Sequence, residues 1–138
     1  MTLPIFLIWL VSILSPSTIG TLTNEKFELA GHIYSVALMN GINPQQFLKL
    51  AECESRLIET AKGDFSSENK SYLAYGAFQF HKQTFNSYKE KYGLKHLEYK
   101  NSYDQTWLAA KIITDPEDKA WGHWLNCRRI TLSQLASL

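Results

Sequence analysis

The sequence predicts a mainly α-helical protein that folds as a single domain. Its 138 residues fit the usual size of one domain, and 45% of them are hydrophobic, which is enough for a substantial core. Apolar residues recur at helical spacing in several segments, whereas no segment shows a convincing strand pattern. Residues 56–74 do not follow the helical pattern, because they are polar and lack apolar residues at helical spacing. We expect a long loop or a small hairpin there.

The chain begins with an apolar segment. Residues 3–14 are almost wholly apolar, and no charged side chain occurs before Glu25. About twelve apolar residues are too few to cross a bilayer comfortably, and small residues up to Gly20 suit cleavage. We therefore interpret residues 1–20 as a secretory signal peptide and residues 21–138 as the domain. Because Lys and Arg are missing from the start, an uncleaved anchor that attaches the chain to a membrane is the alternative.

Two helices are expected at the start of the domain. The first spans about residues 25–40 and ends at Gly41, with an inner face formed by Phe27, Ala30, Tyr34, Ala37 and Leu38. The second spans about residues 44–55, because Asn43 can cap a helix whose first turn contains proline. Its apolar stripe continues to an acidic residue and consists of Phe47, Leu50, Ala51 and Glu54.

Glu54 is placed by this stripe at the C-terminal end of an inward face. Burial disfavours the charged form of a carboxyl group, and so does the negative end of the helix dipole. Both effects raise the pKa of Glu54. A glycosidase needs such a glutamate, protonated near neutral pH, to protonate a glycosidic oxygen. An exposed glutamate in the last turn is the alternative that periodicity leaves open.

Further helices are expected in the second half of the chain. A short apolar run at residues 75–80 precedes a helix of about residues 82–92. Residues 102–105 (Ser-Tyr-Asp-Gln) match a capping box. They open a helix to about Thr114, with an inner face formed by Tyr103, Trp107 and Ala110. We expect a last short helix at residues 131–138.

Composition excludes several classes of function. A net charge of +1 gives no basis for nucleic-acid binding or for a polybasic membrane surface. The histidines lack the spacing of a metal site, so we expect neither a metal nor a cofactor. The two cysteines, Cys53 and Cys127, favour a disulfide in an exported chain, and two buried free thiols are the alternative.

The order of these motifs resembles that of a known family. Ala51–Ser55 (Ala-Glu-Cys-Glu-Ser) is followed by Tyr75–Phe80 (Tyr-Gly-Ala-Phe-Gln-Phe), and Thr84 and Phe85 come shortly after. This pattern resembles the lysozyme-like lytic transglycosylases. The cysteine before Glu54 and the late Trp-Leu-Asn-Cys at residues 124–127 are similar to the resuscitation-promoting-factor branch, which joins such cysteines in a disulfide.

The resemblance implies a lysozyme-like α+β fold and the cleavage of peptidoglycan glycan strands between N-acetylmuramic acid and N-acetylglucosamine. It implies a monomer exported to the periplasm, the cell wall or the medium. Glu54 would be the general acid and then the base, and Cys53 would pair with Cys127.

By the resemblance, Ser55 would orient Glu54 or the substrate, Gly76 would let the backbone approach the glycan, and Gln79 would hydrogen-bond the sugar. An ordinary residue at the helix end is the alternative for Ser55, and a residue that caps its own helix is the alternative for Gln79. Tyr75, Phe78 and Trp124 are candidates for stacking on sugar faces, with packing in the core as the alternative.

The chain departs from the family pattern in two places. The glycine that usually follows Glu-Ser is Arg56, and the late Ala-Tyr-Asn motif is replaced by Trp-Gly-His-Trp at residues 121–124. A substrate-binding tyrosine at that late position is therefore not carried over. His81 and His123 are candidate hydrogen-bonding groups of the cleft, with ordinary surface histidines as the alternative.

The number of carboxylates separates two reactions. Hydrolytic glycosidases usually pair two carboxylates across the bond, and only Asp64 and Glu68 are candidates for a second one. A lone Glu54 favours the 1,6-anhydromuramic product, and a hydrolytic lysozyme-type muramidase is the alternative.

Two other classes of function remain open from the sequence. One is a thiol enzyme in which Cys53 is the nucleophile and His81 or His123 the base. The other is a glycan-binding module that has the same cleft and no activity.

Overall fold

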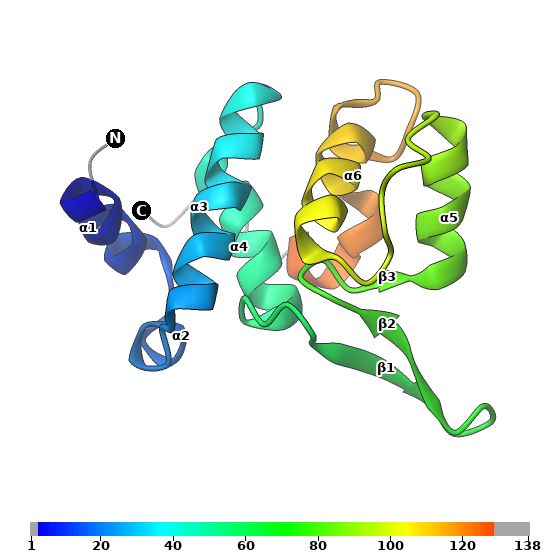
Figure 1. Ribbon diagram of the computed structural model, residues 1–138, viewed down its shortest axis with the longest axis horizontal. Coiled ribbons are helices and arrows are strands. Elements are labelled where there is room, and N and C mark those ends of the chain that lie inside the picture. Colours follow the sequence, from blue (N-terminus) through cyan, green and yellow to red (C-terminus); the bar gives the residue numbers. More distant parts are fainter. Residues whose placement is uncertain (1–2, 129–138) are drawn as a thin grey trace.

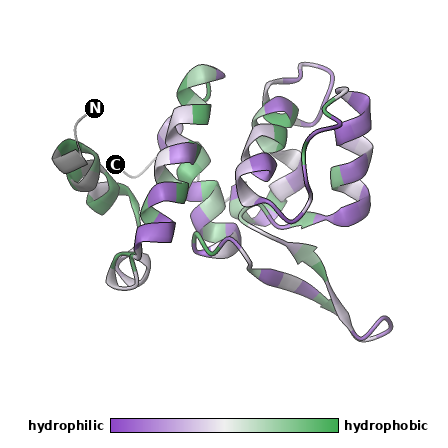
Figure 2. Ribbon diagram, in the orientation of Figure 1, coloured by the Kyte–Doolittle hydropathy of each residue, from purple (hydrophilic) through white to green (hydrophobic). Residues whose placement is uncertain are grey.

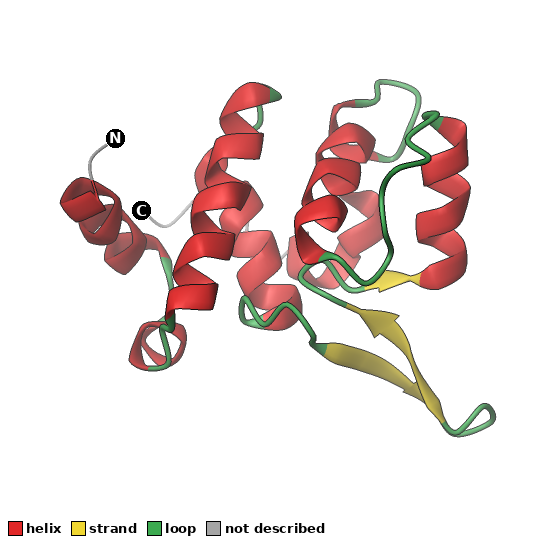
Figure 3. Ribbon diagram, viewed as in Figure 1, coloured by secondary structure: helices red, strands yellow, loops and turns green. Residues whose placement is uncertain are grey.

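The computed structural model describes residues 3–128 (Figure 1). Helices dominate it, and one small sheet follows the fourth helix (Figure 3). The last helix expected from the sequence, at residues 131–138, lies outside the described residues. The elements are α1 (Leu3–Ile13), α2 (Pro16–Gly20), α3 (Asn24–Met39), α4 (Pro44–Ser55), β1 (Lys62–Ser66), β2 (Ser71–Tyr75), β3 (Phe80–His81), α5 (Lys82–Lys91), α6 (Ser102–Thr114) and the 3₁₀-helix η1 (Ala120–Trp124).

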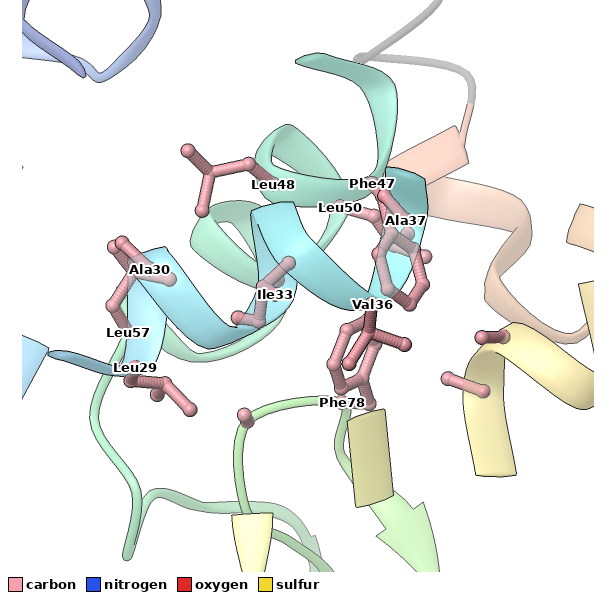
Figure 4. Packing of buried hydrophobic residues seen from close by; sticks show 14 of the residues in the cluster. Leu29, Ala30, Ile33, Val36, Ala37, Phe47, Leu48, Leu50, Leu57 and Phe78 are labelled. Atoms are coloured by element: carbon pink, nitrogen blue, oxygen red, sulfur yellow. The ribbon is translucent and has the colours of Figure 1, made fainter. Parts of the chain in front are cut away.

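The core lies where α3 packs against α4 and α6. Figure 4 shows side chains of α3 and α4 meeting in this layer, with Phe78 reaching it from the turn after β2. The rings of Phe47 and Phe78 are 5.0 Å apart between their centroids, and both are completely buried. The turn that carries the Gly-Ala-Phe-Gln motif is therefore fixed directly to α4.

The polar segment after α4 forms a hairpin, which was one of the two expectations. Strands β1 and β2 pair antiparallel, with Lys62 opposite Tyr75 and Ser66 opposite Ser71. The short β3 pairs with the end of β2, which gives the strand order β1-β2-β3. The tip of the hairpin projects away from the helices (Figure 1). The base of the sheet, in contrast, lies beside the end of α4.

The expected helix α4 is confirmed in its bounds, but the expected inner faces of α3 and α6 are partly wrong. Leu38 is 57% exposed and Trp107 is 38% exposed. α3 has neighbours on several sides, so its buried residues do not form one stripe. The buried residues of α3 are Leu29, Ala30, Ile33, Val36 and Ala37.

The capping box expected at the start of α6 is also wrong. Asn101 is the N-cap, and its side chain accepts hydrogen bonds from the backbone N–H groups of Tyr103 and Asp104. Asparagine is as good an N-cap as serine. Ser102 and Gln105 are thereby left to make other contacts.

The N-terminal segment packs on α3. The Phe6 ring contacts the rings of Phe27 and Tyr34, with centroids 5.3 and 5.7 Å away. Figure 2 shows α1 as mostly hydrophobic and α5 as mostly hydrophilic. None of the helices in the described part of the chain is long and apolar enough to span a membrane.

Candidate active site

Glu54 lies in the last turn of α4, at the end of the stripe that the sequence predicts. Asn43 caps this helix by accepting a hydrogen bond from Gln46 N at 3.1 Å. Phe47 is completely buried. Residue 54 lies seven positions after Phe47, and therefore on the same face of the helix. That face points toward Phe78 and Trp121, which both contact the Phe47 ring.

The Glu54 carboxyl group is partly buried. Among residues 3–128, none is seen to donate a hydrogen bond to it or to form an ion pair with it. Burial raises the pKa of Glu54 from 4.5 to about 7, because desolvation penalises the carboxylate and no nearby cation compensates. The group can thus hold a proton at neutral pH and give it up without a large cost.

Glu52 shows how a neighbouring carboxylate on the same helix differs. Lys49 Nζ lies 2.9 Å from Glu52 Oε1, and Ser15 N donates to Oε2 at 2.9 Å. Glu52 is therefore buried as a member of an ion pair. Of these two carboxyl groups, only Glu54 is left available for proton transfer.

Two residues in left-handed conformation end α4. Arg56 has φ 53° and Leu57 has φ 61°. The backbone N–H of Arg56 donates to Glu52 O at 2.7 Å, which closes the helix. Glycine is the residue that usually takes this conformation, so Arg56 occupies a position that favours glycine. The helix turns away sharply just after Glu54.

Ser55 lies beneath this end of the helix and is 5% exposed. Its hydroxyl donates to Ala51 O at 2.9 Å, one turn back in the same helix. The structure therefore gives the Ser55 side chain a partner within α4.

Gly76 opens the turn that follows β2. It is buried with φ 88°, and its N–H donates to Ala61 O at 2.8 Å. A Cβ at this position would meet the side-chain amide of Gln105. Glycine is therefore required here by a close contact inside the protein, with the side chain of Gln105.

Gln105 and Ser102 hold this turn from α6. Gln105 Oε1 accepts from Phe78 N at 3.1 Å, and Gln105 Nε2 donates to the carbonyls of Tyr75 and Tyr99. The Ser102 hydroxyl accepts from Ala77 N at 3.0 Å and donates to Glu59 O at 2.8 Å. Neither role is predictable from local sequence, because every partner except Tyr99 lies 25 to 43 residues away.

Gln79 has a defined side-chain orientation. Its Nε2 donates to Ala61 O at 2.9 Å and to Gly76 O at 2.8 Å. Both neighbours are acceptors, so the nitrogen is the atom that faces them. The oxygen Oε1 lies over Gly63, where a Cβ would overlap it. Oε1 has no donor among the described residues, and it can accept a hydrogen bond from a ligand.

The aromatic candidates occupy different environments. Phe78 is completely buried, and Trp124 is 5% exposed and donates from Nε1 to Phe78 O at 2.9 Å. Tyr75 is half-buried and lines a cavity of about 340 Å³. Its neighbours there are Lys62, Ser71, Tyr72, Ala74, Tyr99 and Lys100. Tyr75 is therefore the most exposed of the three rings, whereas Phe78 is closed off from a ligand.

The two acidic residues of the hairpin, Asp64 and Glu68, have different surroundings. Asp64 Oδ2 lies 2.7 Å from His81 Nε2 in a half-exposed pair, and Asp64 has φ 54°. Glu68 is exposed in the turn between β1 and β2. The Asp64 side chain thus belongs to the base of the sheet, near Gly63 and Gln79.

The disulfide joins Cys53 to Cys127 across 74 residues. It links the last turn of α4 to the segment after η1, directly beside Glu54. The chain has only two cysteines, so no thiol is free to act as a nucleophile in this structure. The described residues also contain no cluster of three metal-ligating side chains.

These features are a helix ending in an unpaired glutamate, a hairpin and a glycine turn that carries a glutamine. A family model, the transglycosylase SLT domain, matches residues 32–128, well over half of the chain. The chain belongs to this family. It therefore contains a lytic transglycosylase catalytic domain with a lysozyme-like α+β fold, and it is an enzyme.

The transglycosylase SLT domain implies peptidoglycan lytic transglycosylase activity in general. The match does not test the narrower resemblance to the resuscitation-promoting-factor branch. Searches of curated proteins and of solved structures returned no significant match.

Proposed function

We propose that Glu54 is the general acid and then the general base in cleavage of the β-1,4 bond between N-acetylmuramic acid and N-acetylglucosamine. The observation that carries this proposal is a partly buried carboxyl group without any described ion-pair partner, whose burial raises the pKa of Glu54 to about 7. A carboxyl group in this state can protonate the glycosidic oxygen of the leaving sugar. The resulting carboxylate then accepts a proton from the attacking hydroxyl.

The attacking hydroxyl in this proposal is the C6 hydroxyl of the muramic acid. Its oxygen bonds to C1 as the glycosidic C1–O bond breaks, and its proton passes to Glu54, so the product has a 1,6-anhydromuramic end. The engagement of Asp64 by His81 supports this route over hydrolysis, because a hydrolytic pair needs a second carboxylate free to act across the bond.

Other residues are assigned to binding. Gln79 would accept a hydrogen bond from a sugar hydroxyl or acetamido N–H, and Tyr75 would stack on a sugar face. Ser55, Gly76, Phe78 and Trp124 would support the site by fixing the end of α4 and the turn 76–79. A monomer would carry the complete site.

We also propose that the protein acts outside the cytoplasm. Its substrate class lies there, and a disulfide is favoured in oxidising compartments. Residues 1–20 would direct export, either as a cleaved signal peptide or as a retained anchor. The N-terminal sequence of the exported protein, read from its peptides by mass spectrometry, separates the two.

The experiment that tests the function is mass spectrometry of fragments released from purified peptidoglycan. Anhydromuramic ends are one water lighter than reducing ends. We expect anhydro products from the wild type and a loss of at least about 100-fold in Glu54→Gln. Glu52→Gln is the matched control on the same helix and should stay within a few-fold of the wild type.

Three outcomes would change the proposal. Reducing ends alone, together with loss of activity in Asp64→Asn, would make the enzyme a hydrolytic muramidase. Activity in Glu54→Gln close to that of the wild type would remove Glu54 from the mechanism. Glycan binding without any released fragments would indicate a binding module.

A further inference from the structure

Tyr88, Asp118 and His123 form a triangle of close polar contacts. The Tyr88 hydroxyl donates to Asp118 Oδ2 at 2.7 Å, and His123 Nε2 lies 2.7 Å from Asp118 Oδ1. The third side, from Tyr88 Oη to His123 Nε2, measures 2.8 Å. Tyr88 comes from α5 and His123 from η1, so the triangle fixes the histidine ring from two elements.

The protons in this triangle can be assigned. Burial works against the charge on Asp118, but hydrogen bonds from Tyr88, His123 and the Lys119 N–H lower its pKa to about 2. Burial and the contact with Asp118 raise the pKa of Tyr88 to about 12. At neutral pH Asp118 is a carboxylate and Tyr88 keeps its proton. Each Asp118 oxygen accepts, so His123 Nε2 carries a hydrogen.

This assignment leaves one nitrogen of His123 unused. Nδ1 has no partner among the described residues, and the imidazole lines a cavity of about 250 Å³. The other residues that line the cavity are Gln79, Phe80, His81, Thr84 and Trp124. His81 also has a carboxylate partner, because its Nε2 lies 2.7 Å from Asp64 Oδ2, but that pair is far more exposed than the pair of His123 and Asp118.

The cavity favours a neutral, hydroxyl-rich ligand. No lysine or arginine of the described residues lines the cavity, and each imidazole lies against a carboxylate, so the walls offer no free cation that would select an anion. The polar side chains that line it are Gln79, Thr84 and the two histidines, beside aromatic carbon of Phe80 and Trp124. The volume is below the roughly 300–1,000 Å³ of pockets that enclose a whole ligand. One unit of a longer glycan fits it better.

We infer that His123 is a substrate-binding residue that contacts, through Nδ1, the hexosamine unit seated beside Gln79. Tyr88 and Asp118 are positioning residues that act through His123. This inference rests on the proposed function, because it takes the glycan from there. It adds a contact that neither the Glu-Ser motif nor the Gly-x-x-Gln motif contains.

The chain supplies a matched control for the test. Tyr92 lies one turn after Tyr88, at the C-cap of α5. Its ring stacks on that of Tyr88 with centroids 5.9 Å apart, and its hydroxyl donates to Asp115 Oδ2 at 2.7 Å. Tyr92 does not line the Gln79 cavity. Tyr88→Phe and Tyr92→Phe therefore each remove one hydroxyl that donates to an aspartate, and only the first affects His123.

Binding of an N-acetylglucosamine tetramer is measured by calorimetry in the Glu54→Gln background, where no cleavage interferes. We expect Kd to rise about tenfold in His123→Ala and severalfold in Tyr88→Phe, and less than twofold in Tyr92→Phe. Unchanged Kd in His123→Ala would overturn the inference. Tetramer binding and peptidoglycan cleavage are measured separately. The expected loss of binding can therefore be missing while the wild type cleaves peptidoglycan, and it can be seen while the wild type does not cleave.

A second measurement needs no substitution in the triangle. In ¹⁵N-histidine NMR spectra of Glu54→Gln, the tetramer should shift the His123 Nδ1 resonance while Nε2 stays protonated. A merely structural histidine would show no such shift, and its absence at saturating tetramer would also overturn the inference.

Discussion

The side-chain amide of Gln105 fills the space that a side chain at Gly76 would need. A Cβ at residue 76 would stand 2.6 Å from Gln105 Oε1, well inside van der Waals contact. Gln105 donates two hydrogen bonds and accepts one in this position, and it is completely buried. The turn before Gln79 is therefore held by a residue of α6 that lies outside both the Glu-Ser and the Gly-x-x-Gln motifs.

Gly76→Ala should lower the free energy of unfolding by at least about 1 kcal/mol, because alanine at positive φ is strained and its Cβ displaces Gln105. Urea denaturation measures this. Gln105→Ala alone should cost at least about 2 kcal/mol, since it leaves the Phe78 N–H unpaired. The double variant should cost less than the sum, by about 1 kcal/mol. Strict additivity would contradict the contact.

The pH dependence of stability should reveal Glu54. Its pKa is about 7 in the folded protein and near 4.5 in the unfolded chain. The unfolded chain therefore loses the proton first, and stability relative to Glu54→Gln should fall as pH rises from about 4.5 to 7. The fall is at most about 3 kcal/mol, because each pKa unit is worth about 1.4 kcal/mol.

Activity should follow the same group, because the acid must be protonated at the start of the reaction. We expect kcat/KM on peptidoglycan to decline above about pH 7. A decline that sets in near pH 4.5 would show that Glu54 titrates as an ordinary exposed glutamate.

Gly63→Ala tests the orientation of Gln79. The new Cβ would overlap Gln79 Oε1, and the amide would have to move. We expect KM to rise severalfold, as for the loss of one hydrogen bond, with little change in melting temperature. Gly31→Ala is the control, since its Cβ would make only an ordinary contact of 3.6 Å with Phe6. Equal KM values in both variants would argue against a role for Gln79.

Arg56→Gly should stabilise the protein by about 0.5–1 kcal/mol, because φ at this position is 53° and glycine takes that conformation without strain. Thermal unfolding measures the gain. Arg56→Ala removes the same charge but keeps a Cβ, so it should bring no gain. A gain of the same size in both variants would point to the charge instead of the backbone.

Removal of the disulfide should be costly. The bond closes a loop across 74 residues, for which chain entropy predicts about 4 kcal/mol. A variant with serine at both Cys53 and Cys127 should melt at a much lower temperature and should no longer respond to reductant. A wild type whose melting temperature is unaffected by reductant would contradict the bond.

Local signals made α4 and its glutamate predictable. Asn43 and the proline after it fix the start of the helix, and the spacing from Phe47 to Glu54 needs only the helical repeat. The Glu54 pKa follows from that placement. The burial of Glu54 in the last turn also depends on the neighbours of α4, which the helical repeat does not specify.

Long-range contacts made the rest unpredictable. The partners of Gln105 in the glycine turn lie up to 30 residues away. The capping-box interpretation of residues 102–105 instead assigned these side chains to the start of α6. The Asp64–His81 pair requires the sheet register and a positive φ at Asp64. The triangle around His123 joins α5 to η1 through side chains whose spacing matches no motif.

Both hydrogens of the Gln79 side-chain amide are donated to backbone carbonyl groups of the protein, those of Ala61 and Gly76. Whatever meets the remaining oxygen must bring a hydrogen of its own. A free hydroxyl or an amide can do so, whereas the same position capped as an ester or an ether cannot. In the proposed binding mode, acylation of the sugar hydroxyl that meets Gln79 would remove this hydrogen bond without changing the backbone of the glycan.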